Sequence, residues 1–428
     1  MIRPAFIIFF LLSVAVSPVL VFAQANPAFQ YAAAERSMVM LEALRENVIE
    51  QALDQPDLIS PSGDGIMDFI SDRLHPYGNI EFEYSDNIYL LKNDREHDFV
   101  NRINPGVKFI LGPGDLLVRG KNYLELDLGG NISNYFIHHK ADRSNPYAKL
   151  RANLGKGNHR IDFRQEYEVE SLPTSLVSAG KPGTSDYTAN LTDISWETVL
   201  NRFGFDLQYV RKTNDYIGDF RLSNSMSEQT GIFSAFIIPE ATPKTRFLFE
   251  YQYGIISYPK TSTVFNNYYK NKYWTGVRGV ITKKITGTAK FGYETIRYRT
   301  GKEYRTFPVY GDLYYRFSRR ALFILNASRE LGTSSYIYEG NGEYLNIGLT
   351  NRFQINSKTK LISGFFWGKS KYGGGDVRFS YGYPVRLEYS FNKWLSSDVE
   401  YKYQFVQSNN DIYKYSNNVF SVGLKAEF

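Results

Sequence analysis

Residues 377–391 read VRFSYGYPVRLEYSF, and apolar and polar side chains alternate along this stretch without a break. Successive side chains of a β-strand point to opposite faces of a sheet, so the alternation predicts a strand with one apolar and one polar face. The apolar face holds Val377, Phe379, Tyr381, Tyr383, Val385, Leu387, Tyr389 and Phe391. The strand is about 15 residues long, whereas strands of soluble sheets usually have five or six, so it is long enough to cross a bilayer while tilted.

The same period continues through the chain from Gly78 to Phe428. Further apolar faces lie at residues 203–209, 247–255, 307–317 and 399–405. Short turns at residues 112–115, 283–286, 318–320, 356–358 and 392–393 alternate with longer polar loops. This arrangement is typical of barrels in the bacterial outer membrane. The segments predict an all-β fold, a transmembrane antiparallel β-barrel of about 18 strands. A barrel of about 16 strands is the alternative, because residues 187–200 and 228–238 are less regular.

The composition agrees with a barrel better than with a soluble exported protein. The chain has 34 Tyr, 31 Phe and no Cys, so an exported fold of this size has to be stable without disulfides. A transmembrane barrel needs apolar side chains only at alternate positions and gathers aromatic residues at both membrane interfaces. The net charge of +6 is spread over both signs along the chain. Without a basic block, nothing indicates a nucleic-acid partner.

The N-terminal region differs from the rest of the chain. Residues 1–23 resemble a secretory signal, with Arg3 before an apolar stretch and a cleavage site ending at Ala23. An uncleaved membrane anchor is the alternative, and Pro18 argues against it. Residues 24–77 are predicted to form a periplasmic extension and linker, because residues 32–53 have the spacing of an amphipathic helix. Residues 78–428 then form the barrel, and the protein is expected in the outer membrane of a bacterial cell.

The last strand carries a resemblance to known barrels. Phe420, Val422, Leu424 and Phe428 share one face of a strand that ends the chain. An amphipathic strand ending in an aromatic residue resembles the closing strand by which outer-membrane proteins are handed to the barrel assembly machinery. This resemblance implies that the assembly machinery is a partner, together with outer-membrane lipid and lipopolysaccharide.

The first hairpin carries a second resemblance. Residues 83–89 read EYSDNIY, Asp98 and Phe99 follow, and residues 102–107 read RINPGV. Together they resemble the first hairpin of the β-barrel porin 2 family, some members of which are associated with exopolysaccharide export. The resemblance implies an outer-membrane pore or export conduit. In physical terms, residues 85–87 can form side-chain hydrogen bonds that shape the hairpin. Pro105 and Gly106 are predicted to mark a bulge or turn.

Charged side chains on the polar faces are the candidate functional residues. Charges face lipid only at high cost, so they are expected to line the lumen. The candidates are Arg160, Asp162, Arg164, Glu166, Glu168, Glu170, Arg378, Arg386, Glu388, Asp398, Glu400 and Lys402. They either select a permeating solute or bridge one another across a filled barrel, and the sequence leaves both readings open.

No sequence motif points to catalysis. The chain has no Gly-x-Ser-x-Gly motif, no cysteine nucleophile and no phosphate-binding loop, and its five histidines lack metal-ligand spacing. Hence no enzymatic activity, cofactor or metal is predicted. The leading function is a pore or export conduit, with exopolysaccharide as a candidate cargo. The alternatives are a substrate-specific nutrient porin and a membrane-anchored assembly protein with a plugged barrel. In the assembly reading, the helix at residues 32–53 binds a periplasmic or polysaccharide-export partner.

Overall fold

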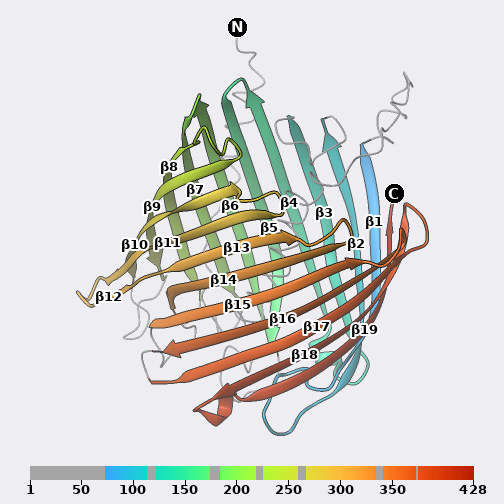
Figure 1. Cartoon of the computed structure of the whole chain (residues 1–428). Helices are drawn as coiled ribbons and strands as arrows, with labels where there is room; N and C mark the ends of the chain where they lie inside the picture. The colour runs from blue at the N-terminus through green and yellow to red at the C-terminus, as the bar shows by residue number, and fades with distance from the viewer. Residues whose placement is uncertain are drawn as a thin grey trace, which may run out of the picture.

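The computed structural model describes residues 73–112, 122–173, 184–217, 225–258, 267–333, 341–372 and 375–428. Over these ranges the chain is almost entirely β-strand, and the strands form one closed antiparallel sheet (Figure 1). Among the described residues, no helix is both long enough and apolar enough to span a bilayer. The signal peptide predicted for residues 1–23 lies outside these ranges. Of the extension predicted for residues 24–77, only residues 73–77 lie inside them.

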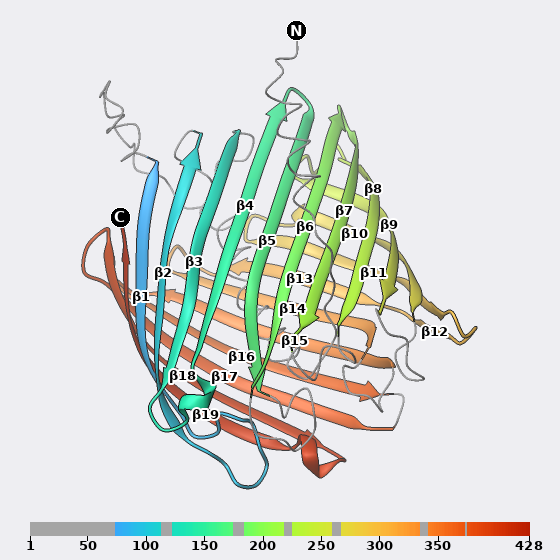
Figure 2. The ribbon, with the colours of Figure 1, turned by 180° about the vertical axis from the view of Figure 1, so that it is seen from behind.

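The strands follow one another around the wall in chain order. They are β1 (Leu74–Ser85), β2 (Asp98–Leu111), β3 (Tyr123–Tyr135), β4 (Arg143–Lys156), β5 (His159–Pro173), β6 (Thr184–Leu200), β7 (Phe203–Tyr216), β8 (Met226–Ile237), β9 (Thr245–Ser257), β10 (Tyr268–Val280), β11 (Ile285–Tyr298), β12 (Glu303–Thr306), β13 (Val309–Arg316), β14 (Ala321–Thr333), β15 (Asn341–Gln354), β16 (Thr359–Tyr372), β17 (Val377–Ser390), β18 (Leu395–Ser408) and β19 (Tyr415–Glu427). Figure 2 shows β1 to β8 side by side, seen from behind.

The wall closes because β1 pairs with β19 as well as with β2. The short strand β12 and strand β13 both pair with β11, and Phe307 and Pro308 separate them. Since β12 and β13 share one place in the wall, the nineteen strands form an 18-stranded barrel. This confirms the predicted count of about 18, and the two less regular segments form β6 and β8.

Details of the first strands differ from the sequence predictions. Strand β1 begins at Leu74, earlier than the expected boundary at Gly78, and the turn predicted at residues 112–115 lies outside the described residues after Gly112. The bulge predicted at Pro105 and Gly106 is wrong, because both residues stay in register with β1. Gly106 instead allows the ring of Tyr77 to lie over it, since a Cβ there would come within 2.3 Å of that ring.

The two ends of the barrel have different connections. Four-residue turns join β10 to β11, β13 to β14, β15 to β16 and β17 to β18, at residues 281–284, 317–320, 355–358 and 391–394. The barrel also begins and finishes at this end, where the Phe428 N–H donates to the Pro76 carbonyl at 3.0 Å. We call this the turn end and the opposite one the loop end. In bacterial barrels the turn end is periplasmic and the loop end faces outward.

A cluster of side-chain hydrogen bonds holds the β1–β19 seam at the loop end. The Asn418 N–H and side-chain amide donate to Asp86 at 2.7 and 2.6 Å. Ser85 donates to the Asn417 side chain at 2.9 Å, and the Asn87 amide donates to the Ser416 carbonyl at 2.9 Å. Residues 85–87, which sequence analysis singled out in the first hairpin, therefore also join the first strand to the last. We refer to these contacts as the seam latch.

Candidate functional site: the inner wall

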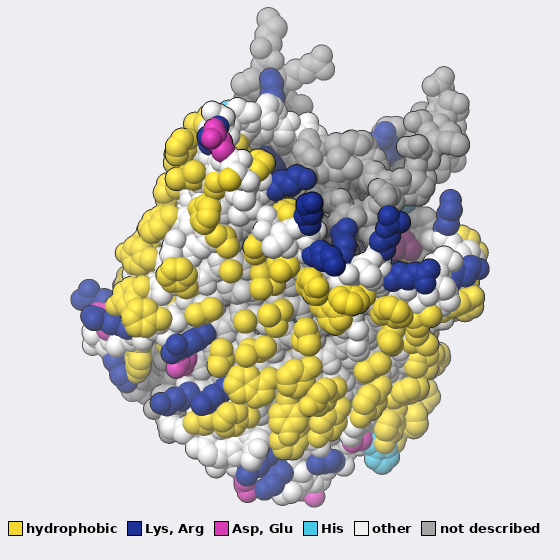
Figure 3. Space-filling view, viewed as in Figure 1, with side chains coloured by type: hydrophobic (Ala, Val, Ile, Leu, Met, Phe, Trp, Pro, Cys, Tyr) yellow, Lys and Arg dark blue, Asp and Glu magenta, His cyan; other side chains and the backbone are white. Residues whose placement is uncertain are grey.

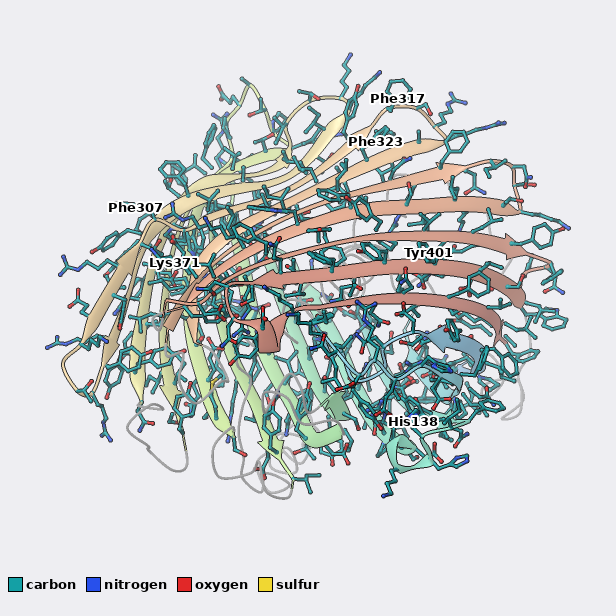
Figure 4. All side chains as sticks on the ribbon, turned by 90° about the horizontal axis from the view of Figure 1, so that it is seen from below. His138, Phe307, Phe317, Phe323, Lys371 and Tyr401 are labelled. Carbon is teal, nitrogen blue, oxygen red and sulfur yellow. The ribbon has the colours of Figure 1, made fainter. Side chains whose placement is uncertain are left out.

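An apolar band covers the outside of the barrel. On β17, Tyr383, Val385 and Leu387 are 44%, 42% and 43% exposed, whereas Arg378 on the opposite face is fully buried. Hydrophobic side chains cover much of the surface formed by the later strands (Figure 3). Figure 4 labels Phe317 and Phe323 on the outside of the wall, and Phe317 is 59% exposed. Since the apolar residues of each strand point outward, the alternate residues line the interior.

The charged face of β5 forms a network of ion pairs. Arg164 binds Glu166 through two hydrogen bonds of 2.7 and 2.8 Å, and Arg160 lies 2.7 Å from Asp162. Side chains of β4 extend the network, because Arg151 reaches Glu166 at 3.4 Å and Lys149 reaches Glu168 at 3.3 Å. Glu170 accepts a hydrogen bond from Tyr187 on β6. The six predicted charges of β5 thus lie together on the face opposite the exposed Ile161 and Tyr167.

The predicted charges of β17 and β18 form a second network around Glu400. Arg386 and Lys402 lie 2.9 and 3.0 Å from Glu400, whose side chain is 4% exposed. Arg386 also approaches Glu388 at 3.9 Å and Asp398 at 4.0 Å.

Arg378 lies apart from this network, at the loop end of β17. It is paired with Asp376 at 2.6 Å, and its guanidinium stacks 3.5 Å from the centre of the Tyr413 ring. The predicted residues therefore occupy separate places on the wall. Within the described ranges, no ion pair links the β5 network to the Glu400 network.

The ion pairs follow the wall of the barrel. The pairs that span most strands join Arg246 on β9 to Glu197 on β6, and Lys272 on β10 to Glu330 on β14. Both join strands only three wall positions apart. Most charges of these networks therefore pair with a near neighbour on the same side of the interior. Ion pairs between described residues do not bridge opposite sides of the barrel.

Sequence reasoning missed a set of inward tyrosines at the loop end. Its members are Tyr135, Tyr187, Tyr216, Tyr268, Tyr344, Tyr372 and Tyr415, all buried, and we call them the tyrosine collar. Tyr187 stacks on Tyr216 with ring centres 5.0 Å apart, and Tyr344 meets Tyr372 edge-on at 5.8 Å. Each lies on the polar face near a strand end. A tyrosine on the polar face near a strand end could have indicated an inward position. Tyrosine is, however, equally common in the outer aromatic belt, so this signal is weak.

A recess lies in the inner wall nearer the turn end. Its volume is about 300 Å³, including space open to solvent, and Glu197, Asp206, Arg246, Glu250 and Arg278 contribute charged groups to its lining. Arg246 binds Glu197 through two bonds of 3.1 Å, and Glu250 pairs with Lys290 at 3.0 Å. Arg278 has no ion pair among the described residues. Its guanidinium is thus the group in the recess best placed to meet an anionic solute.

A closed antiparallel wall, an apolar outer band and a charged interior together define a transmembrane barrel of the bacterial outer membrane. The chain is an outer-membrane β-barrel.

Several solved structures have a similar fold. Pseudomonas aeruginosa OccK2 has a TM-score of 0.46 and 7% identity, over 83% of this chain and 97% of that one. The outer-membrane protein OpdK of the same organism gives 0.45 and 8%, over 83% and 98%.

Acinetobacter baumannii OccAB4 is similar too, with a TM-score of 0.42 and 10% identity, over 83% of this chain and 98% of that one. Likeness at this level concerns the barrel fold alone. No family model matches the sequence of this outer-membrane barrel, and no curated protein does. The resemblance of its first hairpin to the β-barrel porin 2 family therefore stays a prediction.

The remaining sequence predictions concern assembly and chemistry. Phe420, Val422, Leu424 and Phe428 are 48%, 42%, 45% and 62% exposed, which places them on the outer face of the barrel. Their role as an assembly signal stays a prediction. Among the described residues, no group of three or more His, Asp or Glu side chains could hold a metal ion. His138 instead joins Asp98 at 3.0 Å in the loop after β3.

Proposed function

We propose that this barrel is a pore for small hydrophilic solutes, with the selectivity of a nutrient porin. The observation that carries the proposal is the arrangement of the interior charges, which pair along the wall and leave the middle of the barrel unbridged by ion pairs of described residues. A barrel of about 16 to 18 strands encloses an aqueous channel unless something fills it. Charged groups on the wall of such a channel set which ions and solutes enter.

The tyrosine collar supports a selective pore over a wide export conduit. Collar side chains project inward at the loop end, where their packed rings narrow the entrance. Exopolysaccharide export remains the alternative cargo for the same channel. A plugged barrel that serves as a membrane anchor for assembly is the non-conducting alternative.

Two measurements on the full chain test the proposal. In a planar bilayer, the refolded barrel is expected to conduct ions in discrete steps. In liposome-swelling assays, small sugars and carboxylates are expected to enter at rates that fall steeply with solute size. Entry of long oligosaccharides at similar rates would favour the export conduit. A barrel that is demonstrably folded yet neither conducts nor admits solutes would refute the pore and favour the assembly role.

A further inference from the structure

Basic side chains gather on four neighbouring turns at the turn end. The turns at residues 281–284, 317–320, 355–358 and 391–394 read ITKK, FSRR, INSK and FNKW and contain no acidic residue. Their cations are Lys283, Lys284, Arg319, Arg320, Lys358 and Lys393, all exposed, and we call them the basic turn rim. Lys and Arg side chains lie along this edge of the barrel in Figure 3.

Among the described residues, these cations have no acidic partner, unlike several cations at the loop end. At the loop end, Lys92 and Lys414 both pair with Asp411, at 2.7 and 2.6 Å, and Arg305 pairs with Glu303 at 2.6 Å. Within the described residues, no ion pair involves the basic turn rim. Six like charges on adjacent turns repel one another, so an anionic surface bound there is stabilising.

Each of the four turns also begins with an exposed apolar residue. Ile281, Phe317, Ile355 and Phe391 are 40%, 59%, 42% and 46% exposed. Such side chains belong in hydrocarbon or at the membrane interface, where aromatic residues of barrels gather. The cations follow within three positions, so they lie at the level of the lipid headgroups.

Among the described turns, those with two or more neighbouring basic residues or an apolar first residue beside a cation lie on one side of the barrel. On the other side, β4 and β5 are joined by Gly157 and Asn158 alone, and Arg202 in the turn between β6 and β7 is paired with Glu240. The row of four basic turns thus follows β10 to β18. Neighbouring strands are about 4.8 Å apart, so successive turns are spaced about 10 Å apart along the membrane plane. The rim therefore presents a row of cations rather than a single pocket.

We propose that the basic turn rim binds the phosphate groups of anionic phospholipids in the periplasmic leaflet. The apolar first residues of the turns enter the acyl region, while the lysines and arginines contact headgroups, so this side of the barrel is anchored at a fixed depth. An acidic periplasmic protein would match the charge. Such a protein would leave the apolar residue at the start of each turn without a lipid environment. An anionic phospholipid matches both the cations and the apolar residues, so it is the better fit.

Refolding into asymmetric vesicles tests this proposal. A barrel that inserts from outside leaves its turn end in the outer leaflet. Phosphatidylglycerol is therefore placed in the outer or the inner leaflet of phosphatidylcholine vesicles, and urea unfolding is measured. Phosphatidylglycerol in the outer leaflet is expected to raise the folding equilibrium constant on the order of tenfold, because each basic side chain near an anionic surface adds to the attraction. High salt should remove this gain.

Two matched variants complete the experiment. The rim variant carries Lys283→Gln, Arg319→Gln, Lys358→Gln and Lys393→Gln, and the control carries Lys140→Gln, Lys302→Gln, Lys369→Gln and Lys371→Gln at the loop end. The rim variant should lose most of the gain from outer-leaflet phosphatidylglycerol, and the control should keep it. Equal gains from either leaflet, no gain for the natural chain, or equal loss in both variants would each overturn the proposal.

Discussion

Leu387 and Arg386 are neighbours in the chain, yet they lie in opposite surroundings. Leu387 is 43% exposed on the outer face, while Arg386 on the inner face is 2.9 Å from Glu400. A charged side chain that faces lipid finds no polar partner there. A change of charge therefore has very different consequences at Leu387 and at Arg386. Single residues of this barrel therefore report directly on which face they occupy.

Charge introduced on the outer face is expected to destabilise the barrel. Leu387→Arg should cost about 2 to 4 kcal/mol of folding free energy if the position lies near mid-membrane. Arg386→Ser should cost less, because Glu400 keeps Lys402 at 3.0 Å as a partner. Urea titrations of both variants in lipid vesicles measure the difference. Equal losses of stability would mean that the faces are wrongly assigned.

Ion selectivity is expected to depend on Arg278. Replacing this arginine with glutamine removes the cation in the recess that has no described ion pair, so Arg278→Gln should shift the reversal potential toward cation preference. Arg305→Gln is the control, since Arg305 lies at the loop end with Glu303 and its side chain is 67% exposed. Reversal potentials in a salt gradient measure both variants. A shift of the same size in the control would assign the effect to overall charge.

At the scale of strands, the decisive element is the seam. Strands β1 and β19 lie at opposite ends of the chain, and the seam latch joins Asp86 to Asn418 over a sequence separation of 332 residues. Beside it, hydrogen bonds from Lys414 and Lys92 lower the pKa of Asp411 to about 2. A lowered pKa stabilises the fold at higher pH, so this contact between the first and last loops is lost only as the pH falls toward that value.

Loss of the seam latch is expected to slow closure of the barrel. Contacts between distant residues form late because loop closure is entropically costly. Asp86→Ala should therefore lower stability by about 1 to 3 kcal/mol and also slow the last folding phase. Asp142→Ala is the control, because Asp142 accepts the Tyr135 N–H at 2.6 Å within a single hairpin. Heat-modifiability gels over time follow closure, and equal slowing in both variants would contradict a special role of the seam.

Local patterns predict the strands well and their long-range partners poorly. A period of two fixes the face of each residue, so the outward position of Tyr383 follows directly from the sequence. The contact between Arg246 and Glu197 depends instead on strand tilt and stagger, which emerge only when the wall closes. The bulge predicted at Pro105 failed for a similar reason. The ring that needs Gly106 belongs to Tyr77 on the paired strand, and sequence alone does not place it there.

At the scale of the whole molecule, an even number of strands returns both ends of the barrel to the turn end. Of the extension predicted for residues 24–77, residues 24–72 lie outside the described ranges, and the extension would start from the periplasmic mouth. If it folds into that mouth, it is the first candidate for a plug. Because β1 begins at Leu74, a deletion has to end before that residue to keep the seam intact.

Removal of the extension is expected to raise conductance. A barrel without residues 24–72 should show larger single-channel steps than the full chain if the extension narrows the lumen. Single-channel recordings of both forms in the same salt give the comparison, with gel mobility as the check that each is folded. Identical conductance of the two forms would show that these residues do not obstruct the pore.

The alternation of faces also gives the barrel a built-in optical reporter. Of its four tryptophans, Trp196 and Trp394 are 37% and 46% exposed on the outer face, and Trp367 shares that face on β16. Trp274 points inward, with Lys290 and Lys272 at 5.2 and 5.9 Å from its ring. Brominated acyl chains should therefore quench most of the fluorescence and leave a residual emission that disappears in Trp274→Phe. Lys272 and Lys290 are themselves paired with Glu330 and Glu250, so this residual emission reports on the inner face of the wall, and one light signal separates the two faces.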